Sequence, residues 1–396
     1  MSDGGRRLVL AGLLLAGALI GWQQLRLGPG LVETRLASSA RQALAQEEPG
    51  RAAADGVALL RVAPLSAVTG NVLAEVALAR NDRDGAAALY ALSAGRDLRD
   101  VASHAWLADH HGRHGRYREA MEHLGLLLDV HPALRGEVFP ALVGFMAGPD
   151  GMEAILELLR DAPAWRRAFL VQAARELERV DPLLELHTRL RTGERPLTQA
   201  ELAPVVDRMV RDGEARRAWV LFAASLPEDA LPLLGNVFNA SFEAEPGGMV
   251  FDWRFGRVPG ALIERVQELD DQGQAITALR VEFLNRRVPF RHVSQLLVLE
   301  PGEYRLHGRV RLESLRSGPG LEWVVQCAEG GRGIAGRSER FRGTRAWSAF
   351  EARVEVPPDC RAQWLRLQLP ARVDSEQQIV GRLWFDGVRI SRLQGP

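Results

Sequence analysis

Near its C-terminus the chain reads Trp364-Leu-Arg-Leu-Gln-Leu369, and apolar side chains alternate there with polar ones. A period of two residues is typical of a β-strand that buries one face. Turn residues such as Glu300-Pro-Gly302 and Val356-Pro-Pro-Asp359 separate several similar stretches. Many short strands divided by turns predict an all-β sandwich or barrel, a fold that more often binds than catalyses. The other stretches are Ala278–Phe283, Gln295–Leu299, Tyr304–Val310 and Leu383–Phe385.

The same region resembles, in the order of five short motifs, the galactose-binding-like jelly roll of carbohydrate-binding modules. The resemblance covers Asn236 to Leu393 and implies a jelly-roll sandwich that recognises saccharides. Many such modules end in paired aspartates, whereas Gly387 follows Asp386 here, and this departure counts against a calcium site through Asp386. The motifs are Asn239-x-x-Phe-Glu243, the strand Ala278-Leu-x-Val281, Gln295-x-Leu-x-Leu-x-Pro-Gly-x-Tyr304, Trp347-x-x-Phe350 and Phe385-Asp-x-Val388.

Aromatic side chains are frequent in this β region, and sugar rings stack on exposed aromatic faces while arginine reads hydroxyl groups. Alternate residues of a sandwich strand face inward, so most of these aromatics must belong to the core. Trp253 and Trp347 match positions that are structural in the resembling family. The residues that we predict to line a ligand groove, with core or ordinary surface as the alternative for each, are Trp323, Trp384, Arg309 and Arg366.

The chain contains two cysteines, Cys327 and Cys360, and both lie in the β region near the ends of predicted strands. Outside the cytoplasm they would form one disulfide, which closes a loop of about thirty residues and contributes roughly 3 kcal/mol. The alternative is two buried free thiols. The membrane segment described next favours the disulfide.

An apolar run from Leu8 to Trp22 follows Arg6 and Arg7. It is short for a membrane span, but residues up to Leu27 can extend it. A cleaved secretory signal would begin in the same way, yet the one cleavage-like site lies inside the apolar run. We therefore predict an uncleaved, single-pass anchor in a bacterial inner membrane, with the arginines cytoplasmic and residues 30 onward in the periplasm.

Residues 31–232 read as helices, because leucine and alanine recur at spacings of three and four. A repeat of thirty-four residues relates Ala74 to Ala108 and Ala86 to Ala120, and it resembles the tetratricopeptide repeat. Stacked helix pairs of this kind present a surface to protein partners, although a plain helical spacer is the alternative. Beyond Pro140 the predicted helices are Met152–Arg160, Trp165–Val180, Leu183–Leu190, Gln199–Arg211 and Ala215–Leu226.

Three predicted domains result, over residues 1–29, 30–235 and 236–396: a cytoplasmic tip with a transmembrane helix, an all-α tetratricopeptide-like region, and an all-β jelly-roll sandwich. This arrangement resembles helical-repeat proteins of bacterial exopolysaccharide export and assembly loci. The resemblance implies a non-enzymatic scaffold whose repeats bind protein and whose sandwich binds polysaccharide. The alternatives are a protein-only scaffold and a cryptic glycan hydrolase or lyase.

Composition and motifs exclude several function classes. The formal net charge is zero, so nothing indicates a nucleic-acid partner. The absence of lysine excludes a P-loop lysine and Schiff-base chemistry, and no nucleophile motif is present. His110 and His114 are interpreted as solvated turn residues rather than metal ligands, and Gly331-x-Gly-x-x-Gly336 as a hairpin loop without a nucleotide-binding helix. We expect no cofactor, no metal and no catalysis.

Overall fold

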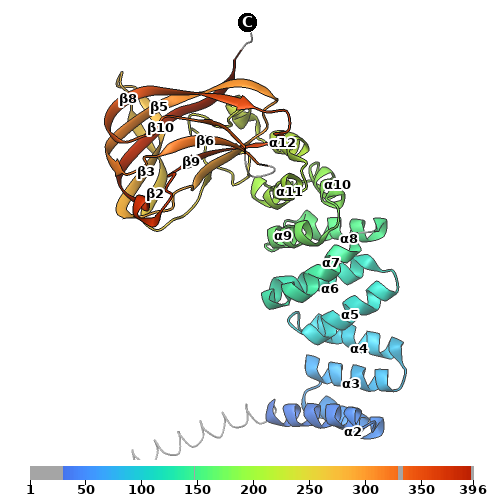
Figure 1. The fold of residues 1–396 in the computed structure, drawn as a ribbon. Coiled ribbons are helices and arrows are strands. Elements are labelled where there is room, and N and C mark those ends of the chain that lie inside the picture. The colour runs from blue at the N-terminus through green and yellow to red at the C-terminus, as the bar shows by residue number, and fades with distance from the viewer. Residues whose placement is uncertain (1–29, 147, 329–332, 394–396) are drawn as a thin grey trace, which may run out of the picture. The chain divides into compact units, whose positions relative to one another are not determined.

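The computed structural model describes residues 30–146, 148–328 and 333–393 (Figure 1). The chain divides into two compact units at the boundary between Trp165 and Arg166. The first is called the helical unit below, and the second, which joins four helices to all the strands, is called the sandwich unit. The change in composition near residue 236 therefore lies inside the sandwich unit.

The helical unit is built from antiparallel helices in sequence order (Figure 1). Ala74, Ala86, Ala108 and Ala120 are all buried where paired helices meet, as the thirty-four-residue repeat predicts. After a first helix over residues 30–45 come α2 (Pro49–Val62), α3 (Ala67–Ala79), α4 (Arg83–Arg96), α5 (Val101–Arg113), α6 (Tyr117–Val130), η1 (Pro132–Leu134), α7 (Arg135–Phe145) and α8 (Pro149–Arg160).

Short polar side chains start the repeat helices. The Ser66 hydroxyl accepts a hydrogen bond from the backbone N–H of Val68 at 3.2 Å, and the Asp100 carboxylate accepts one from Ser103 at 3.3 Å. Such side chains satisfy backbone donors that the first helical turn leaves free. The two caps stand one repeat apart, so the same local signal sets the start of α3 and of α5.

Four helices precede the strands of the sandwich unit: α9 (Arg166–Glu176), α10 (Asp181–Leu190), α11 (Gln199–Arg211) and α12 (Ala215–Ala224). Arg254 donates to the Asp207 carboxylate of α11 at 2.6 Å, and Arg216 of α12 pairs with Glu300. The Phe222 ring of α12 meets Phe238 edge-on, with 5.1 Å between ring centres. These contacts attach the last helices to the β region.

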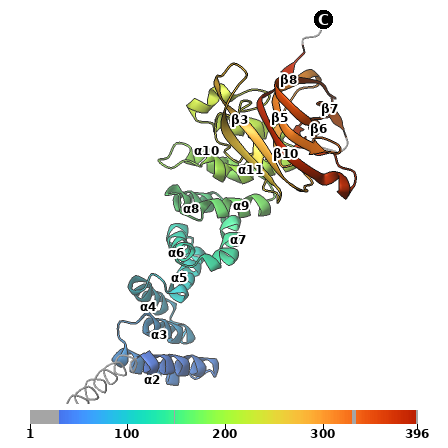
Figure 2. The same cartoon turned by 90° about the vertical axis from the view of Figure 1, so that its left-hand side faces the viewer.

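All strand pairings between named strands are antiparallel, in the order β1-β4-β9-β6-β7-β8-β5-β10-β3-β2. Figure 2 labels β3, β10, β5, β8, β7 and β6. The predicted sandwich is confirmed. The strands are β1 (Arg254–Phe255), β2 (Ala261–Leu269), β3 (Ala275–Arg287), β4 (Val293–Leu297), β5 (Gly302–Ser317), β6 (Glu322–Cys327), β7 (Ile334–Arg337), β8 (Gly343–Val356), β9 (Gln363–Gln368) and β10 (Gln378–Arg392).

Among the described residues, the ladder between named strands passes from one layer of the sandwich to the other through the pair of Gly336 in β7 with Val354 in β8. A Cβ atom at Gly336 would come within 2.6 Å of the Arg353 carbonyl oxygen, closer than side chains tolerate. The glycine thus permits close approach of two backbones at this seam. β6 and β7 pair with each other, and the end of the glycine-rich motif, up to Gly336, lies in β7. Its start, Gly331, lies outside the described residues.

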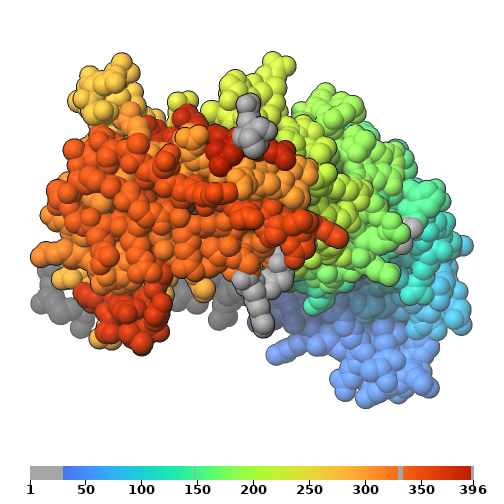
Figure 3. Space-filling model, turned by 45° about the horizontal axis from the view of Figure 1, so that its top comes forward, coloured from blue at the N-terminus to red at the C-terminus, as the bar shows by residue number. Residues whose placement is uncertain are grey.

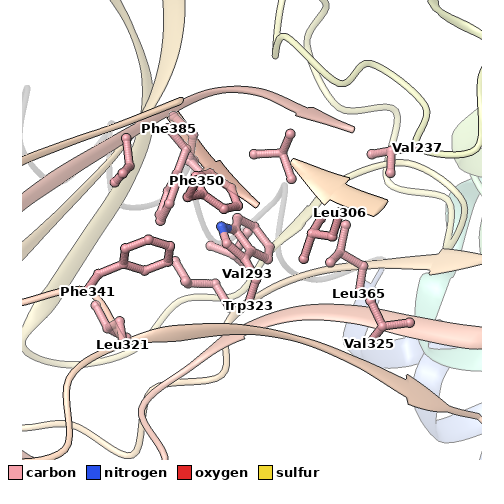
Figure 4. Packing of buried hydrophobic residues seen from close by; sticks show 14 of the residues in the cluster. Val237, Val293, Leu306, Leu321, Trp323, Val325, Phe341, Phe350, Leu365 and Phe385 are labelled. Atoms are coloured by element: carbon pink, nitrogen blue, oxygen red, sulfur yellow. The ribbon is translucent and has the colours of Figure 1, made fainter. Parts of the chain in front are cut away.

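Aromatic rings fill the space between the layers (Figure 4). The Trp323 ring lies 5.2 Å from Phe385 and 5.7 Å from Trp253, and all three are buried. Trp253 also donates its indole N–H to the Asn239 carbonyl at 2.9 Å, which ties the first loop of the β region to the core. Edge-to-face packing of this kind stabilises a core beyond the area it buries.

Within the part of the chain that the structure describes, every helix is too short or too polar to traverse a bilayer. The predicted membrane segment, residues 8–27, lies outside the described residues.

Candidate functional site

The strands β8, β5, β10, β3 and β2 follow one another in one layer; Figure 2 draws strands of this layer as ribbons, and Figure 3 shows the space-filling surface of the molecule from another side. The outer face of this layer is polar. Its inward residues are leucine, valine and phenylalanine, and its outward residues are mostly charged. Opposite charges on neighbouring strands stabilise a solvated sheet face. The pairs are Arg280 with Glu264 at 2.7 Å, Arg382 with both Glu282 and Glu313 at 3.1 Å, and Arg311 with Glu268 at 3.2 Å.

Arg309 lies on this face, and three carboxylates surround its guanidinium group. Asp270 lies 3.5 Å, Asp271 3.3 Å and Asp386 3.8 Å from its nearest nitrogen atoms. Burial raises the pKa of Asp386, although Arg309 and Arg389 oppose that shift. The predicted site residue Arg309 therefore lies at the surface of a sheet, held by the β2–β3 turn and by β10.

An open groove of about 700 Å³ runs beside Arg309 across β5, β8 and β10. His307 contacts the Ser391 hydroxyl at 3.1 Å, Arg389 donates to the Ser241 hydroxyl at 2.9 Å, and Arg305 lies 3.6 Å from the Glu351 carboxylate. We call this the outer-face groove. Its side chains supply both hydrogen-bond donors and acceptors, as a ligand rich in hydroxyl groups requires. The lining includes Arg305, His307, Arg309, Asp386, Arg389 and Ser391.

Two tryptophans lie near this groove in different environments. Trp347 is half-buried, donates its indole N–H to the Leu269 carbonyl at 3.1 Å, and has the Arg309 guanidinium 5.4 Å from its ring centre. Trp384 is only 3% exposed, because Arg311 covers its ring at 3.9 Å. A sugar could stack on Trp384 only after Arg311 moved away, so Trp347 is the more accessible ring.

The resemblance implies a structural position for Trp347, but the spacing of residues along the strand indicates a position on the outer face of the sheet. It stands three residues before Phe350, which is buried in the core. Residues separated by an odd number along a strand point to opposite faces. This parity places Trp347 on the outer face, where the structure has it.

Trp323 and Arg366 require a correction, because neither lies at the groove. Trp323 is fully buried between the layers, so its ring offers no face to a ligand. Arg366 lies on β9 in the opposite layer, where its guanidinium is 5.6 Å from the Trp364 ring and burial lowers its pKa. The four predicted residues are therefore dispersed, and only Arg309 and Trp384 share one sheet face.

A disulfide joins Cys327 at the end of β6 to Cys360 in the turn before β9, with 5.4 Å between their Cα atoms. Both cysteines are buried. The predicted bond is confirmed, and it ties two neighbouring segments of the same layer together.

Histidines of α5 and α6 gather inside the helical unit. Nδ1 of His104 lies 2.9 Å from Nδ1 of His123, and the His111 ring stacks on His123 with 5.6 Å between centres. The rings of His110 and His114 lie 4.5 Å apart and are tilted by 44°. His114 is exposed directly after α5, as predicted, whereas His110 lies in the last turn of the helix and is half-buried. The described part of the chain contains no group of three or more His, Cys, Asp or Glu side chains that could hold a metal ion.

The histidine pair predicts acid sensitivity of the helical unit. Burial first, and then His104 and His111, lower the pKa of His123 from its usual 6.5 to about 4. Between these values the unfolded chain binds a proton that the folded chain does not, so stability falls as pH decreases from 6.5 towards 4. We expect a loss of roughly 1 kcal/mol between pH 7 and pH 5 after allowance for solvent screening. Urea unfolding followed by circular dichroism at both pH values measures it.

A matched variant separates this effect from general acid denaturation. His123→Leu removes the titrating ring, so its loss of stability between the two pH values should be smaller than that of the natural protein. His131, which is half-buried and lies 3.0 Å from the Arg99 carbonyl oxygen, outside the histidine pair, provides the control His131→Leu. Equal pH dependence in the natural protein and His123→Leu would contradict the assignment.

Comparisons with known proteins give distant likenesses. No protein-family model matches this chain, and no curated protein matches it. A solved CBM4 domain is 13% identical, with 40% of this chain and 99% of that one covered and a TM-score of 0.29. TmCBM61, solved in complex with β-1,4-galactotriose, is 16% identical over 40% of this chain and 100% of that one, with a TM-score of 0.28.

A third solved structure, PilF of Pseudomonas aeruginosa, is 17% identical and has a TM-score of 0.26. That alignment covers 53% of this chain and 83% of PilF. At these identities and TM-scores, the likenesses say nothing about ligand or activity. What the chain's own geometry establishes is a helical-repeat unit followed by an antiparallel β-sandwich with an open polar groove.

Proposed function

We propose that this protein is a non-enzymatic scaffold, anchored in a bacterial inner membrane by residues 8–27, that binds polysaccharide through the outer-face groove. The rest of the chain lies in the periplasm, and the helical unit binds a protein partner. The context is assembly or export of an exopolysaccharide.

The observation that carries the saccharide proposal is the outer-face groove itself. Its polar side chains project from β5, β8 and β10, and extended strands in a sheet hold such groups more rigidly than loops do. Trp347 stands beside Arg309 at one side, so an aromatic face and hydrogen-bonding groups occur together. Apolar ring faces and hydroxyl-rich edges are the two surfaces that a saccharide offers.

The disulfide supports the proposed compartment. Bonds such as Cys327–Cys360 form and persist in the periplasm and outside cells, whereas the cytoplasm keeps thiols reduced. A chain that is anchored by residues 8–27, with its arginines in the cytoplasm, would also place the sandwich unit in the periplasm.

A separate groove of about 510 Å³ in the helical unit supports the protein partner. It lies among α5, α6 and α7 and is lined mainly by alanine, leucine, valine and phenylalanine. An amphipathic peptide can lay its apolar face in such a groove. Among the lining residues are Ala105, Ala108, Leu124, Leu127, Val138 and Phe145.

We further propose that the groove performs no chemistry. Its two carboxylates, Asp386 and Glu351, are each engaged in an ion pair, with Arg309 at 3.8 Å and with Arg305 at 3.6 Å respectively. Depolymerisation of a polysaccharide by the purified protein, abolished by Asp386→Asn, would overturn this part of the proposal.

The saccharide proposal predicts a specific loss of affinity. Trp347→Ala should weaken binding of a polysaccharide by about 1 to 3 kcal/mol, on the analogy of base–aromatic stacking. The measurement is affinity electrophoresis of the detergent-solubilised full chain through gels that contain neutral or acidic polysaccharides.

Trp364→Ala is the matched control, because Trp364 is also half-buried but lies on the opposite layer. Its affinity should equal that of the natural protein. Retardation by none of the polysaccharides, or equal weakening by both substitutions, would refute the groove as the binding site.

A further inference from the structure

Aliphatic side chains are exposed at one end of the first three helices of the helical unit. Leu65 is 75% and Leu31 63% exposed, although leucine is ordinarily buried. Contiguous exposed apolar groups mark contact with a protein or a membrane. We call this group the apolar edge, and it consists of Leu31, Val32, Leu60, Val62, Leu65 and Val68.

The fold brings these residues together from three segments. The helix over residues 30–45 and α2 are joined by a tight turn around Glu47, so the start of the first lies beside the end of the second. The hydrogen bond from the Ser66 hydroxyl to the Glu33 carboxylate confirms this placement and adds the start of α3. The edge is thus a feature of the folded hairpin and not of one amphipathic helix.

The charges at this end are few and mainly positive. Arg35 and Arg61 are exposed there, whereas the acidic group in these segments, Glu33, is engaged by Ser66. Arginine beside apolar groups suits the phosphate level of a bilayer, where the guanidinium meets lipid phosphate and the aliphatic chains enter the acyl boundary.

We propose that the apolar edge lies in the surface of the membrane and fixes the helical unit against it. The occupant of the edge is lipid, and this inference rests on the proposed anchor. Only a few residues separate Leu27, the end of the predicted span, from Leu31. An extended chain covers at most about 3.5 Å per residue, so Leu31 lies within roughly 14 Å of the end of the span.

The apolar edge would also fix the orientation of the helical unit. A single span linked to a flexible chain would let the helical unit point in any direction. An edge that also enters the lipid surface adds a second attachment, and the span makes that weak contact effectively intramolecular. The first helix hairpin would then have a fixed orientation on the bilayer.

A single labelled cysteine tests this placement in the full chain. Both natural cysteines are bonded to each other, so Leu65→Cys provides one reactive thiol for the fluorophore NBD. The labelled protein is reconstituted into vesicles of phosphatidylethanolamine and phosphatidylglycerol, and flotation confirms incorporation. Spin-labelled lipid should quench the fluorophore. Aqueous dithionite should reduce the fluorophore several-fold more slowly than it reduces the same label on unfolded protein in detergent-free buffer.

Ala45→Cys is the matched control. It is exposed at the opposite end of the first helix, about 20 Å along the axis from Leu31. Its label should escape lipid quenching and react rapidly with dithionite. The apolar edge is assigned to lipid if only the Leu65→Cys label is quenched.

The outcomes separate the edge from the anchor. If the protein floats but the Leu65→Cys label is not quenched by lipid, the edge proposal is wrong while the anchor stands. A label that is shielded from dithionite but not quenched means that a second protein copy covers the edge, which also overturns the proposal. If the protein does not float, the anchor and the edge fall together.

Discussion

Trp323→Ala should lower the free energy of unfolding of the sandwich unit by about 3 to 5 kcal/mol, because it empties the centre of the core. The ring is fully buried against Trp253 and Phe385, and surrounding strands of both layers can collapse into the space only partly. Urea unfolding followed by near-ultraviolet circular dichroism, which reports packed aromatic rings, measures the change.

Trp347→Ala is the control for the same residue type at the surface. Its ring is half-buried, so the substitution leaves no enclosed cavity and should cost clearly less stability. The two substitutions are therefore expected to change different quantities: Trp323→Ala lowers stability, and Trp347→Ala lowers affinity for the polysaccharide. Equal unfolding midpoints for Trp323→Ala and the natural protein would show that Trp323 does not occupy the core.

Removal of the disulfide should lower stability by about 3 to 4 kcal/mol, since the bond restricts the unfolded chain. It spans 33 residues, and the entropy lost from the unfolded state increases slowly with that length. The double variant Cys327→Ala, Cys360→Ala, or the natural protein under a reducing agent, should show the decrease in the transition of the sandwich unit.

The helical unit provides an internal control for this experiment. Neither cysteine belongs to it, so its own transition should not shift when the bond is reduced. A decrease well below 1 kcal/mol in the sandwich unit would mean that the unfolded chain retains structure around these residues even without the bond.

The strands could be predicted from sequence because they alternate. Trp364–Leu369 overlaps β9 and Tyr304–Val310 lies within β5, with every second side chain in the core. β6 lacks this signal, because Glu322, Trp323, Val324 and Val325 are all buried. Where both faces of a strand are covered, alternation cannot tell which side chain points to a groove. The prediction for Trp323 was wrong for this reason.

Contacts between distant segments could not be predicted from the sequence either. Helix α11 begins and ends at the predicted residues, Gln199 and Arg211, since a capping box of Thr198 and Glu201 starts it. The pairing of His104 with His123, by contrast, depends on how α5 and α6 pack face to face. The groove beside Arg309 likewise combines three strands whose register no local pattern specifies.

The seam at Gly336 divides the sandwich into two layers that can diverge separately. Arg254 of β1 contacts α11, so the layer that contains β1 carries an attachment to the helices, and Glu300, in the turn between β4 and β5, pairs with Arg216 of α12. The outer-face groove belongs to the other layer. Substitutions that change ligand specificity can therefore accumulate in one layer while the contacts with the helices are retained in the other.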